Sequence, residues 1–223
     1  MEYAISRATP DSFLSTVFAW MFVGLLVTAG IAGAVGTSES MLTDVTSNPL
    51  ILLVVIVFQL GLVFVLAARA DRMSAPAATG LFLLYAALNG VMFAFIFELY
   101  TTQSIFTTFA ITAAMFGSMA AYGYFTGADL SKLGAILFMA LIGLILATIV
   151  NLFWANDALY WITTYAGVAI FAGLTAYDMQ KLKRYGEAGA SGQGRAIQGA
   201  LALYLDFINM FLFLLRIFGQ ARN

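Results

Sequence analysis

The sequence contains no cysteine and no histidine, and only three of its 223 residues are proline. These absences exclude disulfides, thiolate and imidazole metal ligands, cysteine nucleophiles and acid–base catalysis by histidine. Charged residues are also scarce, at 9% of the chain against about a quarter in an ordinary soluble domain. The formal net charge is -1 and no block of like charge occurs, so no nucleic-acid partner is expected. Any chemistry must use carboxylates, Lys, Arg, Tyr or hydroxyl groups.

Apolar residues are abundant instead, at 62% of the chain, and the mean hydropathy is +0.95. A bilayer core of about 30 Å needs about 20 apolar residues per helix. Seven runs of this length occur, at residues 12–35, 49–69, 80–99, 106–125, 133–154, 158–181 and 197–218. The sequence therefore predicts an all-α integral membrane protein, a seven-transmembrane-helix bundle that forms one membrane domain over residues 1–223.

Lysine and arginine are distributed unevenly between the two ends of these runs. Eight of the ten fall on the N-terminal side of the membrane, namely Arg7, Arg69, Arg72, Lys132, Lys181, Lys183, Arg184 and Arg195. The other side has only Arg216 and Arg222. By the positive-inside rule we expect a cytoplasmic N-terminus and an external C-terminus. A last segment that re-enters instead of crossing is the alternative, although its length suffices to cross.

Two carboxylates lie inside predicted spans, Asp178 in the sixth and Asp206 in the seventh. A charged side chain at the bilayer centre costs about 2.5–3.5 kcal/mol, so such residues usually face the bundle interior and mark function. Asp206 lies about nine residues, or about 14 Å, into its span. Both aspartates are expected in the cytoplasmic half, where two consecutive antiparallel spans could bring them together. Alternatively, Asp178 is an interfacial residue paired with Lys181.

The seventh run carries a stripe of small and polar residues at three- and four-residue steps. Its members are Gly199, Ala202, Asp206, Asn209, Phe213 and Arg216. On an otherwise bulky apolar helix, such a stripe is expected to face protein or water. Asn209 and Arg216 are therefore candidate pore-lining residues.

Four stretches, "YAALNGVMFAFIFELYTTQSI", "AAYGYFTGADLSKLG", "GLTAYDMQKLK" and "ALALYLDFINMFLFLLRIFG", resemble signature segments of the Bax inhibitor (transmembrane Bax inhibitor motif) family in its bacterial branch. The resemblance implies a seven-helix fold with a central last helix. It also implies a pH-sensitive calcium leak governed by an aspartate pair that matches Asp178 and Asp206. An arginine latch at the end of the second span would be Arg69. Family members commonly carry a glutamate where this chain has Gln59.

The residues themselves are compatible with such a leak. Two carboxylates a few ångströms apart resist double ionisation, which makes a proton switch without histidine. Ca²⁺ prefers oxygen ligands, so Asp178 and Asp206, with backbone carbonyls, Asn209 or waters, could form a weak calcium site suited to passage. Calcium is then the transported ion, protons and membrane lipid are the other expected partners, and no cofactor is expected.

Two other functions compete with the channel. An intramembrane aspartyl protease would need a motif like Gly-x-Gly-Asp, whereas the chain reads "LYLD" at Asp206. No nucleophile–base arrangement or phosphate loop is present, so no enzyme is predicted. A regulator of a membrane protease or another membrane partner could bind through the polar segment 179–196, which we expect to be a loosely structured cytoplasmic loop.

The expected location is the bacterial cytoplasmic (inner) membrane.

Overall fold

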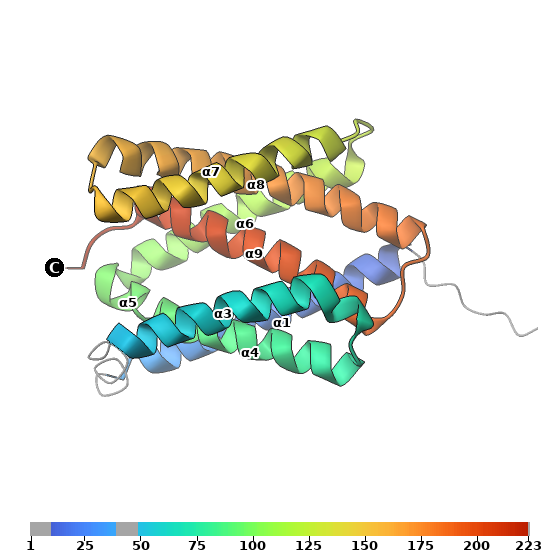
Figure 1. Cartoon of the computed structure of the whole chain (residues 1–223), viewed down its shortest axis with the longest axis horizontal. Helices are drawn as coiled ribbons and strands as arrows, with labels where there is room; N and C mark the ends of the chain where they lie inside the picture. Colours follow the sequence, from blue (N-terminus) through green and yellow to red (C-terminus); the bar gives the residue numbers. More distant parts are fainter. Residues whose placement is uncertain (1–9, 39–48, 223) are drawn as a thin grey trace, which may run out of the picture. The chain divides into compact units, whose positions relative to one another are not determined.

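The computed structural model of the protein describes residues 10–38 and 49–222. Its helices, labelled in Figure 1, are α1 (Pro10–Gly36), α3 (Pro49–Arg69), the 3-10 turn η1 (Ala70–Arg72), α4 (Ala75–Ala94), α5 (Ile96–Leu99), α6 (Thr102–Phe125), α7 (Ser131–Phe153), α8 (Asp157–Glu187) and α9 (Gln193–Phe218). Helix accounts for 88% of the structure, and the described residues form no strand. Arg7 and Asn223 lie outside the described residues.

The described part of the chain has seven helical segments long and apolar enough to cross a membrane. The third of them, Ala75–Leu99, includes both α4 and α5. Each predicted run corresponds to one segment, so the predicted all-α membrane fold is confirmed. The protein is a membrane protein.

Helix starts follow from local sequence chemistry. All three prolines, Pro10, Pro49 and Pro76, lie in the first turn of a helix, where the missing N–H has no intrahelical partner to lose. Helix α6 instead begins with an N-cap, because the Thr101 hydroxyl accepts a hydrogen bond from the Ser104 N–H at 3.4 Å.

The predicted loose loop at 179–196 was wrong in extent. Helix α8 continues to Glu187 and α9 begins at Gln193, which leaves a connection of residues 188–192. Gly189 and Gly192 adopt positive φ angles of 77° and 99° there, a conformation that glycine reaches without a Cβ penalty. The polar composition of the segment predicts a loop, but a helix can extend beyond the apolar membrane core with polar side chains in water.

By packing, the chain falls into two compact units, Met1–Leu99 with Leu182–Tyr204, and Tyr100–Lys181 with Leu205–Asn223. In unit 1, α1 packs along α4, and a Cβ at Gly90 would meet Ile31 at 2.8 Å. The Thr28 hydroxyl donates to the Ala86 carbonyl at 2.9 Å and lies 2.6 Å from the Tyr204 hydroxyl. Because the single hydroxyl hydrogen of Thr28 is donated to Ala86, the Tyr204 hydroxyl must donate to the Thr28 oxygen.

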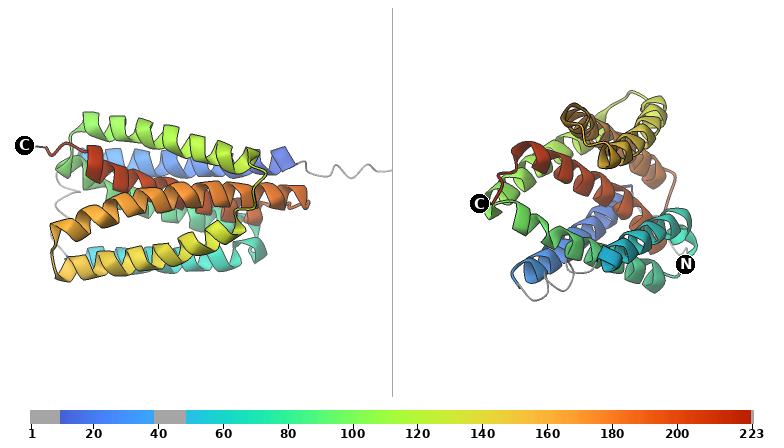
Figure 2. Two further views of the ribbon diagram at one scale, coloured as in Figure 1. Left: turned by 90° about the horizontal axis from the view of Figure 1, so that it is seen from above. Right: turned by 60° about the vertical axis from the view of Figure 1, so that its left-hand side comes forward.

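In unit 2, α7 and α8 run side by side, as both views of Figure 2 show. The Tyr177 ring packs over Gly134, and Leu137 packs against Gly173. Helix α6 approaches α8 still more closely, since a Cβ on Gly123 would lie only 2.1 Å from the Ala176 carbonyl oxygen. Gly123 thus allows the backbones of α6 and α8 to approach closely, and Gly134 and Gly173 make room for side chains between α7 and α8 near the turn that carries Asp178.

Helix α9 is the most enclosed of the seven spans, with 56% of its apolar window buried, whereas α7 has 11%. Its first half belongs to unit 1 and its second half, from Leu205, to unit 2. This agrees with the predicted central last helix. A helix with little lipid contact can carry polar side chains that a lipid-facing helix cannot.

Candidate functional site

Asp206 is buried within unit 2, with only 4% of its surface exposed. Its carboxylate oxygen Oδ2 has no hydrogen-bond partner among the described residues. An unpaired carboxylate in an apolar interior is costly unless the group is protonated or takes a ligand. Such a side chain is therefore suited to proton or cation binding.

The helix register places Asp178 beside Asp206. On α8 and α9, the rings of Phe171 and Phe213 stack with centroids 6.0 Å apart. Asp178 follows Phe171 by seven residues and Asp206 precedes Phe213 by seven. Because seven residues are close to two full turns and the helices are antiparallel, both aspartates lie at one level and on the facing sides of their helices.

The two carboxylates are close enough for their charges to interact. Asp178 is half-buried, and the charge of Lys181 also acts on it. The predicted juxtaposition of the aspartates and the alternative interaction with Lys181 thus occur together. Lys181 offsets part of the negative charge on the side of Asp178, while Asp206 has no such neighbour in the part of the chain described.

The predicted stripe on α9 faces α8. Within unit 1, Gly199 packs against Leu182, and within unit 2 Phe213 packs against Gly167. Asn209, half-buried, donates from Nδ2 to the Leu205 carbonyl at 2.8 Å. The stripe is therefore a helix-packing surface in which Asp206 is embedded.

Arg216 lies ten residues beyond Asp206, or about 15 Å along the helix. Its guanidinium group stacks over the rings of Tyr160 and Phe213, 5.4 and 5.1 Å from the centroids. Burial raises the pKa of the nearby Tyr100 hydroxyl above its ordinary value, and the charge of Arg216 opposes that rise. The pore-lining roles of Arg216 and Asn209 stay predictions.

Arg69, the predicted latch, ends α3 with an exposed side chain. It belongs to unit 1, whereas Asp178 belongs to unit 2. Its pairing with Asp178 stays a prediction.

No group of three or more Asp or Glu side chains that could hold a metal ion occurs within residues 10–38 and 49–222. The candidate site therefore offers two carboxylates, Asp178 and Asp206. Both are hard oxygen ligands of the kind that Ca²⁺ prefers, and any further ligands would be carbonyls, hydroxyls or waters.

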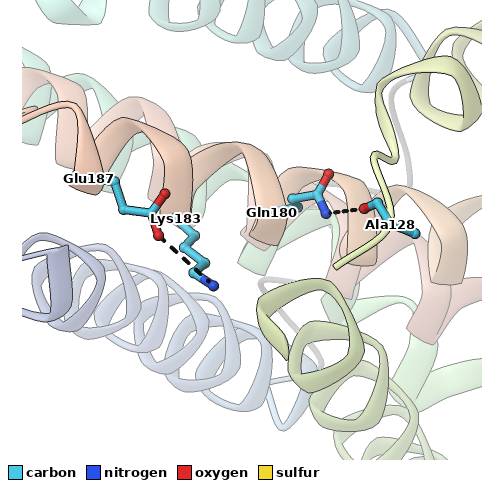
Figure 3. A network of polar contacts seen from close by, with 4 residues as sticks. All are labelled: Ala128, Gln180, Lys183 and Glu187. Carbon is cyan, nitrogen blue, oxygen red and sulfur yellow. Dashed lines mark hydrogen bonds and ion pairs between the residues drawn. The ribbon is translucent and has the colours of Figure 1, made fainter. Parts of the chain in front are cut away.

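Gln180 belongs to the same turn of α8 and was not singled out from the sequence, because it lay within the predicted loop. Its side chain is buried, donates from Nε2 to the Ala128 carbonyl at 2.7 Å and accepts from the Leu130 N–H at 2.9 Å. Figure 3 shows the contact with Ala128, together with the ion pair of Lys183 and Glu187 at 3.9 Å further along α8. Gln180 thus ties the α6–α7 connection to the helix that carries Asp178.

The chain matches the model of the family described as "Inhibitor of apoptosis-promoting Bax1" over residues 10–223. It is 48% identical over 221 residues to the inner membrane protein YbhL of Escherichia coli (strain K12), covering 97% of this chain and 94% of the relative. A protein of Borreliella burgdorferi is 42% identical over 217 residues, covering 96% and 94%. A membrane protein of Streptococcus pyogenes (serotype M3) is 41% identical over 184 residues, covering 82% and 80%.

Proposed function

The chain belongs to the Bax inhibitor family, and on that premise we propose that it is a pH-sensitive calcium leak channel of the membrane. Protonation of the Asp178–Asp206 pair gates the leak in this proposal. The observation that carries it is the pair itself, two carboxylates at one level of α8 and α9, one of them buried with an oxygen that has no protein partner.

The chemistry of the pair supports both gating and passage. Two neighbouring carboxylates repel each other when both are ionised, so the number of protons that they hold changes with pH. When ionised, the same oxygens attract Ca²⁺. With only two carboxylates the affinity is low, which suits an ion that must leave as readily as it enters.

Arg69 acts as the latch in this proposal. An ion pair between Arg69 and Asp178 would be lost when the carboxylate takes up a proton. The second span, which Arg69 ends, would then be freer to move, so one proton would bias a two-state element. The pairing rests on the family resemblance.

The proposed location is the bacterial inner membrane, with the N-terminus in the cytoplasm. The location is supported by the name of the relative in Escherichia coli. The orientation is supported by the excess of lysine and arginine on the N-terminal side of the spans.

A second candidate is a non-enzymatic regulator that binds a membrane protease or another membrane partner. It is favoured by the family description, which names inhibition of a protein rather than transport. The polar end of α8, which includes Lys183 and Glu187, would then offer the contact surface.

Flux through the purified protein separates the two candidates. The protein is reconstituted into liposomes that contain a fluorescent calcium indicator, with no other protein present, and calcium entry is followed across a pH series. A channel gives protein-dependent, pH-dependent calcium entry. Entry equal to that of empty liposomes at every pH, with protein shown to be folded and inserted, would favour the regulator.

A further inference from the structure

Thr108 of α6 is completely buried, and its hydroxyl has no hydrogen-bond partner in the described ranges. Three other hydroxyls of the same helix behave differently. Those of Thr107, Thr112 and Ser118 each donate to the carbonyl four residues earlier, at 2.9, 2.8 and 2.8 Å. That bond is the usual way for a helical hydroxyl to be satisfied in an apolar environment. The Thr108 hydroxyl is therefore available for another ligand.

Thr108 and Asp206 lie on either side of one ring contact inside unit 2. Phe109, next to Thr108, meets Phe207, next to Asp206, edge-to-face with centroids 5.3 Å apart. The Phe207 ring also meets Phe116 at 5.5 Å, so α9 at this level faces the stretch of α6 from 109 to 116. The buried side of that stretch continues with Thr112, one turn from Thr108.

Two deeply buried oxygens, the Thr108 hydroxyl and Asp206 Oδ2, thus belong to facing helices and have no protein partner. Buried polar atoms are nearly always satisfied, by protein, water or an ion. A hydroxyl oxygen and a carboxylate oxygen are both hard ligands for a cation that keeps part of its water shell, and the ring contact between them makes them two successive positions. An apolar or anionic ligand would leave the carboxylate unsatisfied.

We propose that Asp206 Oδ2 and the Thr108 hydroxyl are two successive contacts for a partly hydrated divalent cation inside unit 2, on either side of the Phe109–Phe207 ring contact, so that Thr108 extends the ion pathway from the aspartate pair along α6. This inference rests on the proposed calcium leak and adds a residue outside α8 and α9 to it. In this proposal Thr108 of α6 contacts the ion, whereas its exposed neighbour Thr107 does not.

Flux through matched variants tests the step. Thr108→Val keeps the shape and removes the hydroxyl, Thr108→Ser keeps the hydroxyl, and Thr107→Val makes the same change on the exposed face. Losing an oxygen that contacts a charged ligand is expected to lower calcium flux about three- to tenfold in Thr108→Val. Thr107→Val should keep wild-type flux, and Thr108→Ser should recover most of the flux that Thr108→Val loses. If Thr108→Val does not fold, Thr108→Ala removes the hydroxyl without adding atoms.

Thiol labelling tests the same step without depending on conduction, because the chain has no cysteine of its own. In Thr108→Cys, a small water-soluble thiol reagent should modify the new cysteine, and millimolar Ca²⁺ should slow the reaction. In Thr107→Cys, Ca²⁺ should leave the labelling rate unchanged.

The results distinguish the inference from the proposed function. Wild-type flux in folded Thr108→Val, with labelling at position 108 that Ca²⁺ does not affect, would overturn the inference and leave only a structural water at this place. A wild-type protein that conducts no calcium would overturn the leak, whereas calcium-protected labelling at position 108 would still support a cation site.

Discussion

Asp178 on α8 lies level with Asp206 on α9, two helical turns from the ring stack that pairs the two helices. The pair is asymmetric. Asp178 is half-buried and feels the charge of Lys181, whereas Asp206 is buried with an unpartnered oxygen. Substitution of Asp206 therefore removes one titrating carboxyl group without removing the interaction between Asp178 and Lys181.

Asp206→Asn should remove most of the pH dependence of calcium flux and leave the fold intact. The amide has nearly the same shape as the carboxyl group but cannot titrate. Flux in liposomes across a pH series measures the effect, and size-exclusion behaviour in detergent monitors folding. A variant that keeps the wild-type pH profile would refute the sensor hypothesis.

Arg69→Ala should raise calcium leak at neutral pH. Without the guanidinium group, the ionised carboxylate of Asp178 has no latch partner, and the second span is held less firmly. Arg72→Ala is the matched control, because Arg72 is also exposed but ends the 3-10 turn that follows α3. Equal flux in wild type and both variants would mean that Arg69 only extends toward lipid phosphate.

A single introduced cysteine should report the orientation of the chain. In Asn223→Cys, a membrane-impermeant thiol reagent should label intact cells from outside, because seven crossings place the two termini on opposite sides. Lys132→Cys should be protected in intact cells and labelled only after the membrane is opened. Protection of position 223 would instead indicate a last segment that re-enters.

Gly123→Ala should destabilise the protein although it adds a single methyl group. The new Cβ would meet the Ala176 carbonyl oxygen at 2.1 Å, so α6 must move away from α8, at a cost of about 1–3 kcal/mol. Gly117→Ala on the same helix meets no described atom within 4 Å and should leave stability unchanged or slightly higher. Thermal unfolding in detergent compares them, and equal midpoints would contradict the close approach.

Tyr204→Phe and Thr28→Val should be coupled. Each removes one hydroxyl of the buried relay from Tyr204 through Thr28 to the Ala86 carbonyl, and the double variant should cost less than the sum by about 0.5–1.5 kcal/mol. Thr28→Ser keeps the hydroxyl and should retain most of the stability. Strict additivity in unfolding measurements would show that the two hydroxyls act independently.

Much of the fold could be predicted from composition, because a membrane-spanning helix is a local structure. A run of about 20 apolar residues determines a span by length and solvent alone, without reference to other helices. For the same reason Asp206 could be selected from the sequence, since a carboxylate within such a run is costly wherever the bundle places it. A helix end that lies in water has no comparable hydrophobic signal, so the sequence predicts a loop where the polar end of α8 continues to Glu187.

The sequence alone thus determined the seven spans, the membrane solvent and the two carboxyl groups within the spans, since each depends on the free energy of transferring a segment or a side chain. Only the tertiary structure decided which atoms meet. The seven-residue spacing from the Phe171–Phe213 stack places Asp178 opposite Asp206, but nothing in the sequence indicates that those two rings touch. Likewise Gln180 and Thr108 look like ordinary helix residues. Only the packing of neighbouring elements shows that Gln180 is hydrogen-bonded to the α6–α7 connection and that the Thr108 hydroxyl has no partner among the described residues.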